Sequence, residues 1–90
     1  MGLDMMEVLL EAEEEFDVKL PTDGFPDTVG GFYDRIIDSL REQRPERFDA
    51  DADYSDKVWE QLKAMLVYQL ALNPDDVVRS AHWVRDLDCL

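Results

Sequence analysis

Three stretches of the chain, residues 4–16, 28–43 and 55–72, carry apolar residues at the three- and four-residue spacing of one buried helical face. Each stretch is long enough for several helical turns. We therefore predict three main helices that pack against one another around a single core. We expect this core to include Val8, Leu9, Phe16, Val29, Phe32, Ile36, Leu62, Leu66, Leu70 and Val84.

Local signals predict where these helices begin and end. Asp4 and Glu7 have the spacing of a capping box at the start of the first helix. Thr28 is the expected N-cap of the second helix. The third helix should begin at Ser55 or Asp56 and end before Asn73-Pro74, because proline cannot continue a helix.

The segments between the predicted helices lack a helical period. Residues 17–27 contain two prolines and a glycine, which favour an extended chain with a turn and at most one short helical turn. Residues 41–54 mix charges with a proline, which indicates a linker of 14 residues that can span up to about 45 Å. This linker would join a helix-loop-helix half, residues 1–40, to a helix-plus-loop half, residues 55–90.

The C-terminal segment after Pro74 is expected to be a loop with a helical turn or two. It has no glycine-rich phosphate loop and no paired cysteines. Its apolar side chains should anchor it on the helices. The expected anchors are Val77, Val78, Trp83, Val84 and Leu87.

Length and composition describe one soluble domain. Ninety residues suffice for a single modest core, and the longest apolar runs fall far short of the about 20 residues that cross a bilayer. The single cysteine, Cys89, excludes an internal disulfide and suits a reducing compartment. Together with the lack of a signal-peptide pattern, this favours a cytoplasmic location.

Charge narrows the possible partners. Twenty-two acidic and nine basic residues give a net charge of −13, which would repel nucleic acid and attract basic protein surfaces. The first predicted helix concentrates this charge on its polar side. This acidic stripe is either a docking surface for a basic partner or an ordinary solvated face, and it comprises Asp4, Glu7, Glu11 and Glu14, extended by Glu13 and Glu15.

Other chemistry has weaker support. Asp49, Asp51, Asp53 and Glu60 match part of the spacing of a calcium loop, but Tyr54 occupies the position where that loop needs glycine. A solvated acidic linker is therefore the preferred interpretation, and the alternative is a general acidic interaction domain, with or without a response to calcium. The chain has one histidine, His82, and no nucleophile placed to use it, so we do not expect an enzyme. A reactive Cys89 thiol is a further alternative.

The two ends of the sequence become one continuous pattern when the C-terminus is placed before the N-terminus. Read in this order, four segments resemble the acyl carrier protein family: "LALNPDDVV", "HWVRDL", "LDMMEVLLEAEEEFDVKLP" and "TVGGFYDRII". The resemblance covers nearly the whole chain outside residues 41–54. It implies an all-α, acyl-carrier-like bundle of three or four helices with circularly permuted connectivity, in which Leu90 lies beside Met1.

The resemblance also bears on the site that carries the family's prosthetic group. Family members bind phosphopantetheine through the serine of an Asp-Ser-Leu motif. In this chain Met1 falls on the aspartate, Gly2 on the serine and Leu3 on the leucine, so the hydroxyl that would be modified is missing. The serines of this chain, Ser39, Ser55 and Ser80, lie in other contexts. We therefore predict no covalent cofactor, with a working carrier completed in another way as the alternative.

The family's recognition surface does carry over. Glu7, Glu11 and Glu14 match the helix that the family presents to basic patches of partner enzymes, which points to an enzyme of acyl or thioester metabolism as the partner. The family's third helix should be reduced or lost, because residues 21–28 are too few for it. The chain would be a monomer, or a dimer in which residues 55–90 of one copy pack on residues 1–40 of another.

Overall fold

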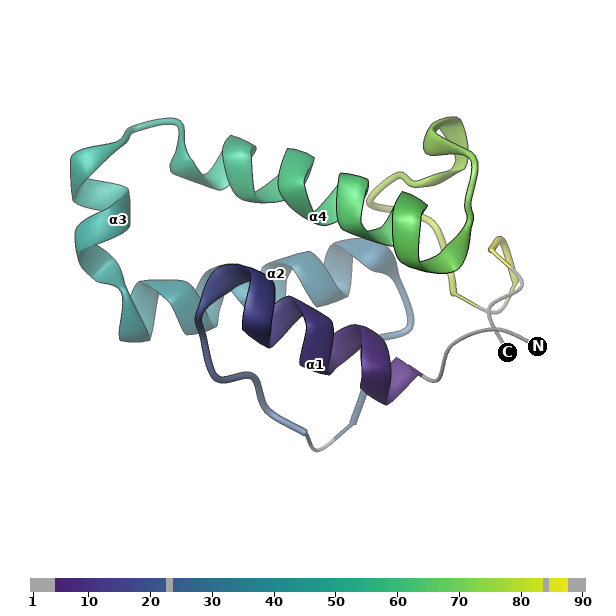
Figure 1. Cartoon of the computed structure of the whole chain (residues 1–90), viewed down its shortest axis with the longest axis horizontal. Coiled ribbons are helices and arrows are strands. Elements are labelled where there is room, and N and C mark those ends of the chain that lie inside the picture. The colour runs from purple at the N-terminus through teal and green to yellow at the C-terminus, as the bar shows by residue number, and fades with distance from the viewer. Residues whose placement is uncertain (1–4, 23, 84, 88–90) are drawn as a thin grey trace.

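The computed structural model describes residues 5–22, 24–83 and 85–87. In this part of the chain every regular element is helical, which confirms the all-α prediction. The elements in order are α1 (Met5–Phe16), α2 (Val29–Gln43), α3 (Pro45–Ala50), α4 (Tyr54–Leu70) and the single 3₁₀ turn η1 (Pro74–Asp76). Figure 1 shows α2 and α4 running along the long dimension of the molecule, with α3 joining them at one end.

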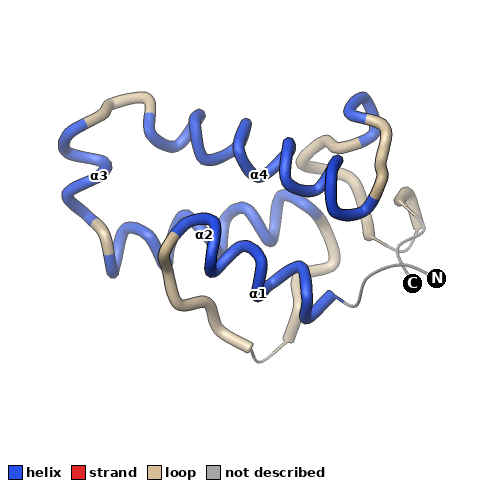
Figure 2. Tube along the Cα trace, viewed as in Figure 1, coloured by secondary structure: helices blue, strands red, loops and turns tan. Residues whose placement is uncertain are grey.

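The three predicted main helices are present with boundaries close to those expected. Thr28 is the N-cap of α2, and its hydroxyl oxygen accepts a hydrogen bond from the Gly31 N–H at 3.1 Å. α4 begins at Tyr54 and ends at Leu70, where Ala71 takes a left-handed conformation with φ 53°. Figure 2 shows the extended segment between α1 and α2, which has no helix in its described residues. The prediction of at most a short turn there is confirmed.

The segment expected to be a linker contains a helix. Pro45 occupies the first turn of α3, where its missing N–H is not needed, so it starts a helix here instead of only ending one. Phe48 of α3 packs edge-on against Tyr54 at a centroid distance of 4.9 Å, and the guanidinium of Arg41 lies 4.4 Å from the Phe48 ring. The Arg47 guanidinium donates to the Phe16 carbonyl oxygen at 2.7 Å. The linker is thus a short helix fastened to α1 and α4.

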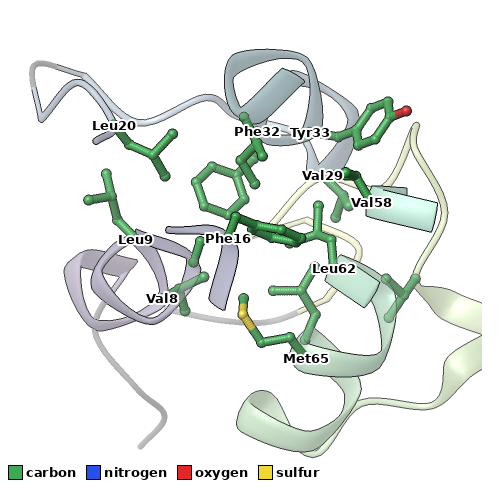
Figure 3. Close-up of a cluster of buried hydrophobic side chains, with 14 of the residues drawn as sticks. Val8, Leu9, Phe16, Leu20, Val29, Phe32, Tyr33, Val58, Leu62 and Met65 are labelled. Carbon is green, nitrogen blue, oxygen red and sulfur yellow. The ribbon is translucent and has the colours of Figure 1, made fainter. Parts of the chain in front are cut away.

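The core lies where α1, α2 and α4 converge, as the labelled side chains in Figure 3 show. Most of the predicted core is confirmed as buried: Val8, Leu9, Phe16, Val29, Phe32, Ile36, Leu62 and Leu66. Leu70 is only partly buried, because it is the last residue of α4, and Val84 lies outside the described residues. None of the described helices is both long and apolar enough to cross a membrane.

The C-terminal loop packs on the start of α2. The Val29 and Gly30 N–H groups, which α2 itself cannot satisfy, donate to the carbonyl oxygens of Ala81 and Arg79 at 2.9 and 2.7 Å. The backbone N–H of Trp83 adds a third hydrogen bond, which it donates to the Asp27 carbonyl oxygen at 3.1 Å. The loop therefore caps α2 with its own backbone.

Side chains hold the same loop in place. The Trp83 ring packs edge-on against Phe25 and Phe32, with centroids 5.7 and 6.0 Å apart. Val77, Trp83 and Leu87 are buried, as expected of anchors. The prediction for Val78 is wrong: this side chain is 45% exposed, because its neighbour Val77 is the one that η1 directs into the core.

Candidate functional site on the outer face of α1

The side of α1 that faces away from the core combines acidic and apolar side chains. Met6 and Leu10, one turn apart, are 43% and 52% exposed. Glu7 and Glu14 are exposed beside them on the same side of the helix. We refer to Met6, Glu7, Leu10 and Glu14 as the α1 docking face. A pair of exposed apolar side chains flanked by carboxylates can contact a partner that is basic and apolar at once.

The remaining glutamates of α1 already have partners within the chain. Glu11 accepts a hydrogen bond from the Gln69 amide at 3.3 Å, and Glu15 accepts one from the Gln61 amide at 2.6 Å. Glu13 accepts one from the backbone N–H of Leu20 at 2.7 Å. The structure therefore separates the three glutamates predicted to contact a partner. Glu11 lies toward α4, whereas Glu7 and Glu14 are exposed on the outer side of α1. Asp4 lies outside the described residues.

A shallow hollow extends the docking face at the C-terminal end of α1. It has a volume of about 630 Å³, and Leu10 and Glu14 line it together with Val18 and Arg44. Gln43, which also lines the hollow, fixes the backbone of Lys19. Its side-chain oxygen accepts the Lys19 N–H at 2.9 Å, and its side-chain nitrogen donates to the Lys19 carbonyl oxygen at 2.8 Å. An apolar group of a partner could enter this hollow while its cations approach the glutamates.

The electrostatics of this face favour a basic partner. Five glutamates and no basic residue lie between Met5 and Phe16. Within the described part of the chain, no ion pair involves any of these glutamates, since the acidic members of the four pairs are Asp17, Asp51 and Asp86. Cations from outside the chain would relieve the repulsion among these carboxylates.

The residues of the calcium alternative do not converge. Asp49 lies in α3 and Glu60 on the exposed side of α4. Asp51 forms an ion pair with Lys57 and accepts the Asp53 N–H at 3.0 Å, and these two contacts lower its pKa, the lysine contact more strongly. No group of three or more metal-binding side chains is found among the residues described.

His82 has a structural position in the C-terminal loop. It forms an isolated antiparallel bridge with Thr28, and its N–H donates to the Asp86 carboxylate at 2.8 Å. This hydrogen bond, followed by one from Arg85, lowers the pKa of Asp86. The imidazole Nδ1 accepts the Arg85 N–H at 3.3 Å. These contacts tie His82 to the turn at residues 85–87.

The serines considered as attachment sites lie in different parts of the fold. Ser39 lies within α2 and Ser55 in the first turn of α4, where its carbonyl oxygen accepts the Tyr33 hydroxyl at 2.8 Å. Ser80 is exposed in the C-terminal loop. The predicted meeting of the chain ends and the positions of Gly2 and Cys89 fall outside the described residues. In Figure 1 the start of α1 and residues 85–87 lie toward the same end of the long axis.

The sequence analysis missed Met6 and Leu10, whose side chains are the apolar part of the docking face. Their four-residue spacing on the glutamate side of the helix was the available signal. A scan against protein-family models, a search of curated proteins and a search of solved structures find no match to this chain. The class that the structure itself defines is a small all-α protein with an acidic, partly apolar helix face.

Proposed function

We propose that this protein is an acyl-carrier-like docking module with circularly permuted connectivity, which binds a basic surface on an enzyme of acyl or thioester metabolism without a covalent phosphopantetheine. The observation that supports docking is the exposure of Met6 and Leu10 between Glu7 and Glu14, none of which forms the core. The resemblance of the rotated sequence to acyl carrier proteins suggests the class of partner. Contacts of α4 with both α1 and α2 are compatible with such a bundle.

The proposal of no prosthetic group is supported by the sequence at the attachment point that the resemblance implies. Gly2 replaces the serine and offers no hydroxyl for a phosphodiester. Expression beside a phosphopantetheinyl transferase, followed by intact mass measurement, is expected to return the unmodified mass. A gain of one phosphopantetheine would show a working carrier and reject this part of the proposal.

If the protein docks through α1, the effect of a charge reversal on partner affinity should depend on where the residue lies on the helix. Glu14→Lys on the docking face is expected to weaken partner binding by about tenfold, because it places a cation among those of the partner. Glu15→Lys changes the net charge equally but lies toward Gln61 of α4, so it should change the affinity less than about twofold. Calorimetry against a panel of purified enzymes that act on acyl carrier proteins measures both.

A variant of the apolar part separates docking from simple charge attraction. Leu10→Ser should reduce affinity about as much as Glu14→Lys while leaving the melting temperature nearly unchanged, since this side chain is 52% exposed. Equal losses for Glu14→Lys and Glu15→Lys, with none for Leu10→Ser, would show that net charge alone drives binding and would reject the docking face.

A further inference from the structure

A second exposed surface lies on α4, on the side that faces away from the core. Tyr68 is 84% exposed, the highest value among the large apolar side chains described. Beside it is a hollow of about 410 Å³, open to solvent and lined by Glu60, Lys63, Ala64, Val67, Tyr68 and Pro74. An exposed aromatic ring next to an apolar hollow is a feature of protein contact surfaces.

The charge on α4 distinguishes it from the docking face. α4 carries two acidic residues, Asp56 and Glu60, and two basic residues, Lys57 and Lys63, so its charges balance. α1 in contrast has five glutamates and no cation. In a chain with a net charge of −13, a second copy would meet less repulsion at α4, whose own charges balance, than at α1.

The positions of these charges match a copy of the same helix running in the opposite direction. Residues 60 and 63 lie at equal distances on either side of a point near residue 62. Residues 57 and 68 also lie on either side of that point, at distances that agree within one residue. An antiparallel pairing about that turn therefore brings Glu60 of each copy to Lys63 of the other. It also brings each Tyr68 ring over the aliphatic stem of the other copy's Lys57, whose ammonium is bound to Asp51. Neither Glu60 nor Lys63 has an ion-pair partner within the described chain.

We infer that the outer face of α4 is a homodimer interface, in which two copies pack antiparallel about a two-fold axis near residue 62. The small side chain of Ala64 lets the two helices approach closely. Stable complexes bury about 1,200–2,000 Å² of surface. Because each copy would contribute only one face of a 17-residue helix, we expect a smaller buried area and therefore a weak, concentration-dependent association. This dimer differs from domain exchange, because each copy keeps its own fold and leaves α1 open.

The test is a charge swap across the two-fold axis, measured by sedimentation equilibrium from micromolar to millimolar concentration. Glu60→Lys and Lys63→Glu should each weaken dimerisation by about tenfold, because two ion pairs become two like-charge contacts. The double variant, Glu60→Lys with Lys63→Glu, restores both pairs in reversed polarity and should dimerise like the wild type. Tyr68→Ser should weaken the dimer in every background.

Net charge provides the internal control. Glu60→Lys makes the chain less negative, which by itself would favour association, so a loss of dimer in this variant reports the local contact. Glu46→Lys, in the first turn of α3, makes the same charge change outside α4 and should not weaken the dimer. A monomeric wild type at millimolar concentration, a dimer indifferent to these substitutions, or a double variant that fails to recover would each overturn the inference. A domain-exchanged dimer would also be indifferent to these substitutions, so it would overturn the inference as well.

Discussion

Replacing Trp83 with alanine is expected to lower the free energy of unfolding by about 3–5 kcal/mol. The side chain is 3% exposed and packs edge-on against Phe25 and Phe32, so its removal opens a cavity between the C-terminal loop and α2. A domain of this size has a total stability of about 5–13 kcal/mol, so the loss is a large fraction of it. Urea denaturation followed by circular dichroism measures the change.

Trp83→Phe is the matched control, because it separates the packing of the ring from its polar atom. The indole Nε1 is buried and has no hydrogen-bond partner among the residues that the structure describes. Phenylalanine keeps an aromatic ring against Phe32 and removes an unsatisfied donor, so we expect a cost below about 1.5 kcal/mol. If phenylalanine were as damaging as alanine, the aromatic contact would not be what holds the loop.

The second large effect is expected at Gly30. A Cβ atom at this position would lie 2.6 Å from the Arg79 carbonyl oxygen, which is backbone and also accepts the Gly30 N–H. Gly30→Ala should therefore displace the C-terminal loop and lower the free energy of unfolding by about 2–3 kcal/mol, although alanine is the better helix former by about 1 kcal/mol. The same denaturation measurement applies.

Gly31→Ala provides the comparison for this prediction. A Cβ atom there would lie 2.9 Å from a ring carbon of Pro26 and 3.3 Å from the Thr28 hydroxyl oxygen. The nearer atom belongs to the Pro26 ring, which moves only with its backbone, and the other belongs to the N-cap side chain of α2. The gain in helix propensity offsets part of the resulting strain, and no backbone hydrogen bond is broken, so the expected cost is about 1 kcal/mol, smaller than at Gly30. A Gly30→Ala variant as stable as Gly31→Ala would show that the loop does not pack this closely on α2.

The three main helices could be predicted because each buries a long apolar stripe whose period is visible in the sequence. α3 could not, since six residues make fewer than two turns and none of its side chains is fully buried. Its helix depends instead on Pro45 at the first turn and on the contacts of Phe48 and Arg47. The capping of α2 by the carbonyl oxygens of Arg79 and Ala81 could not be predicted from the sequence either, because it joins segments about 50 residues apart.

The candidate site could be predicted in part. The acidic character of α1 is plain from its composition, but which glutamates stay open depends on α4. Glu11 and Glu15 are bound by Gln69 and Gln61, residues that no local pattern connects to α1. The exposure of Leu10 was also uncertain from the sequence, because five of the six residues from Met5 to Leu10 are apolar and the helix can bury only one side of them.

The measurement that tests the central claim most directly is backbone-amide NMR of the protein during titration with a partner enzyme identified by calorimetry. We predict that shifts and line broadening concentrate on residues 6–14 of α1 and on the adjoining hollow at Val18 and Lys19. The amides of α4 and of residues 77–83 should change little. Perturbations centred on α4 or on the C-terminal loop, or no binding by any enzyme that acts on acyl carrier proteins, would contradict the account.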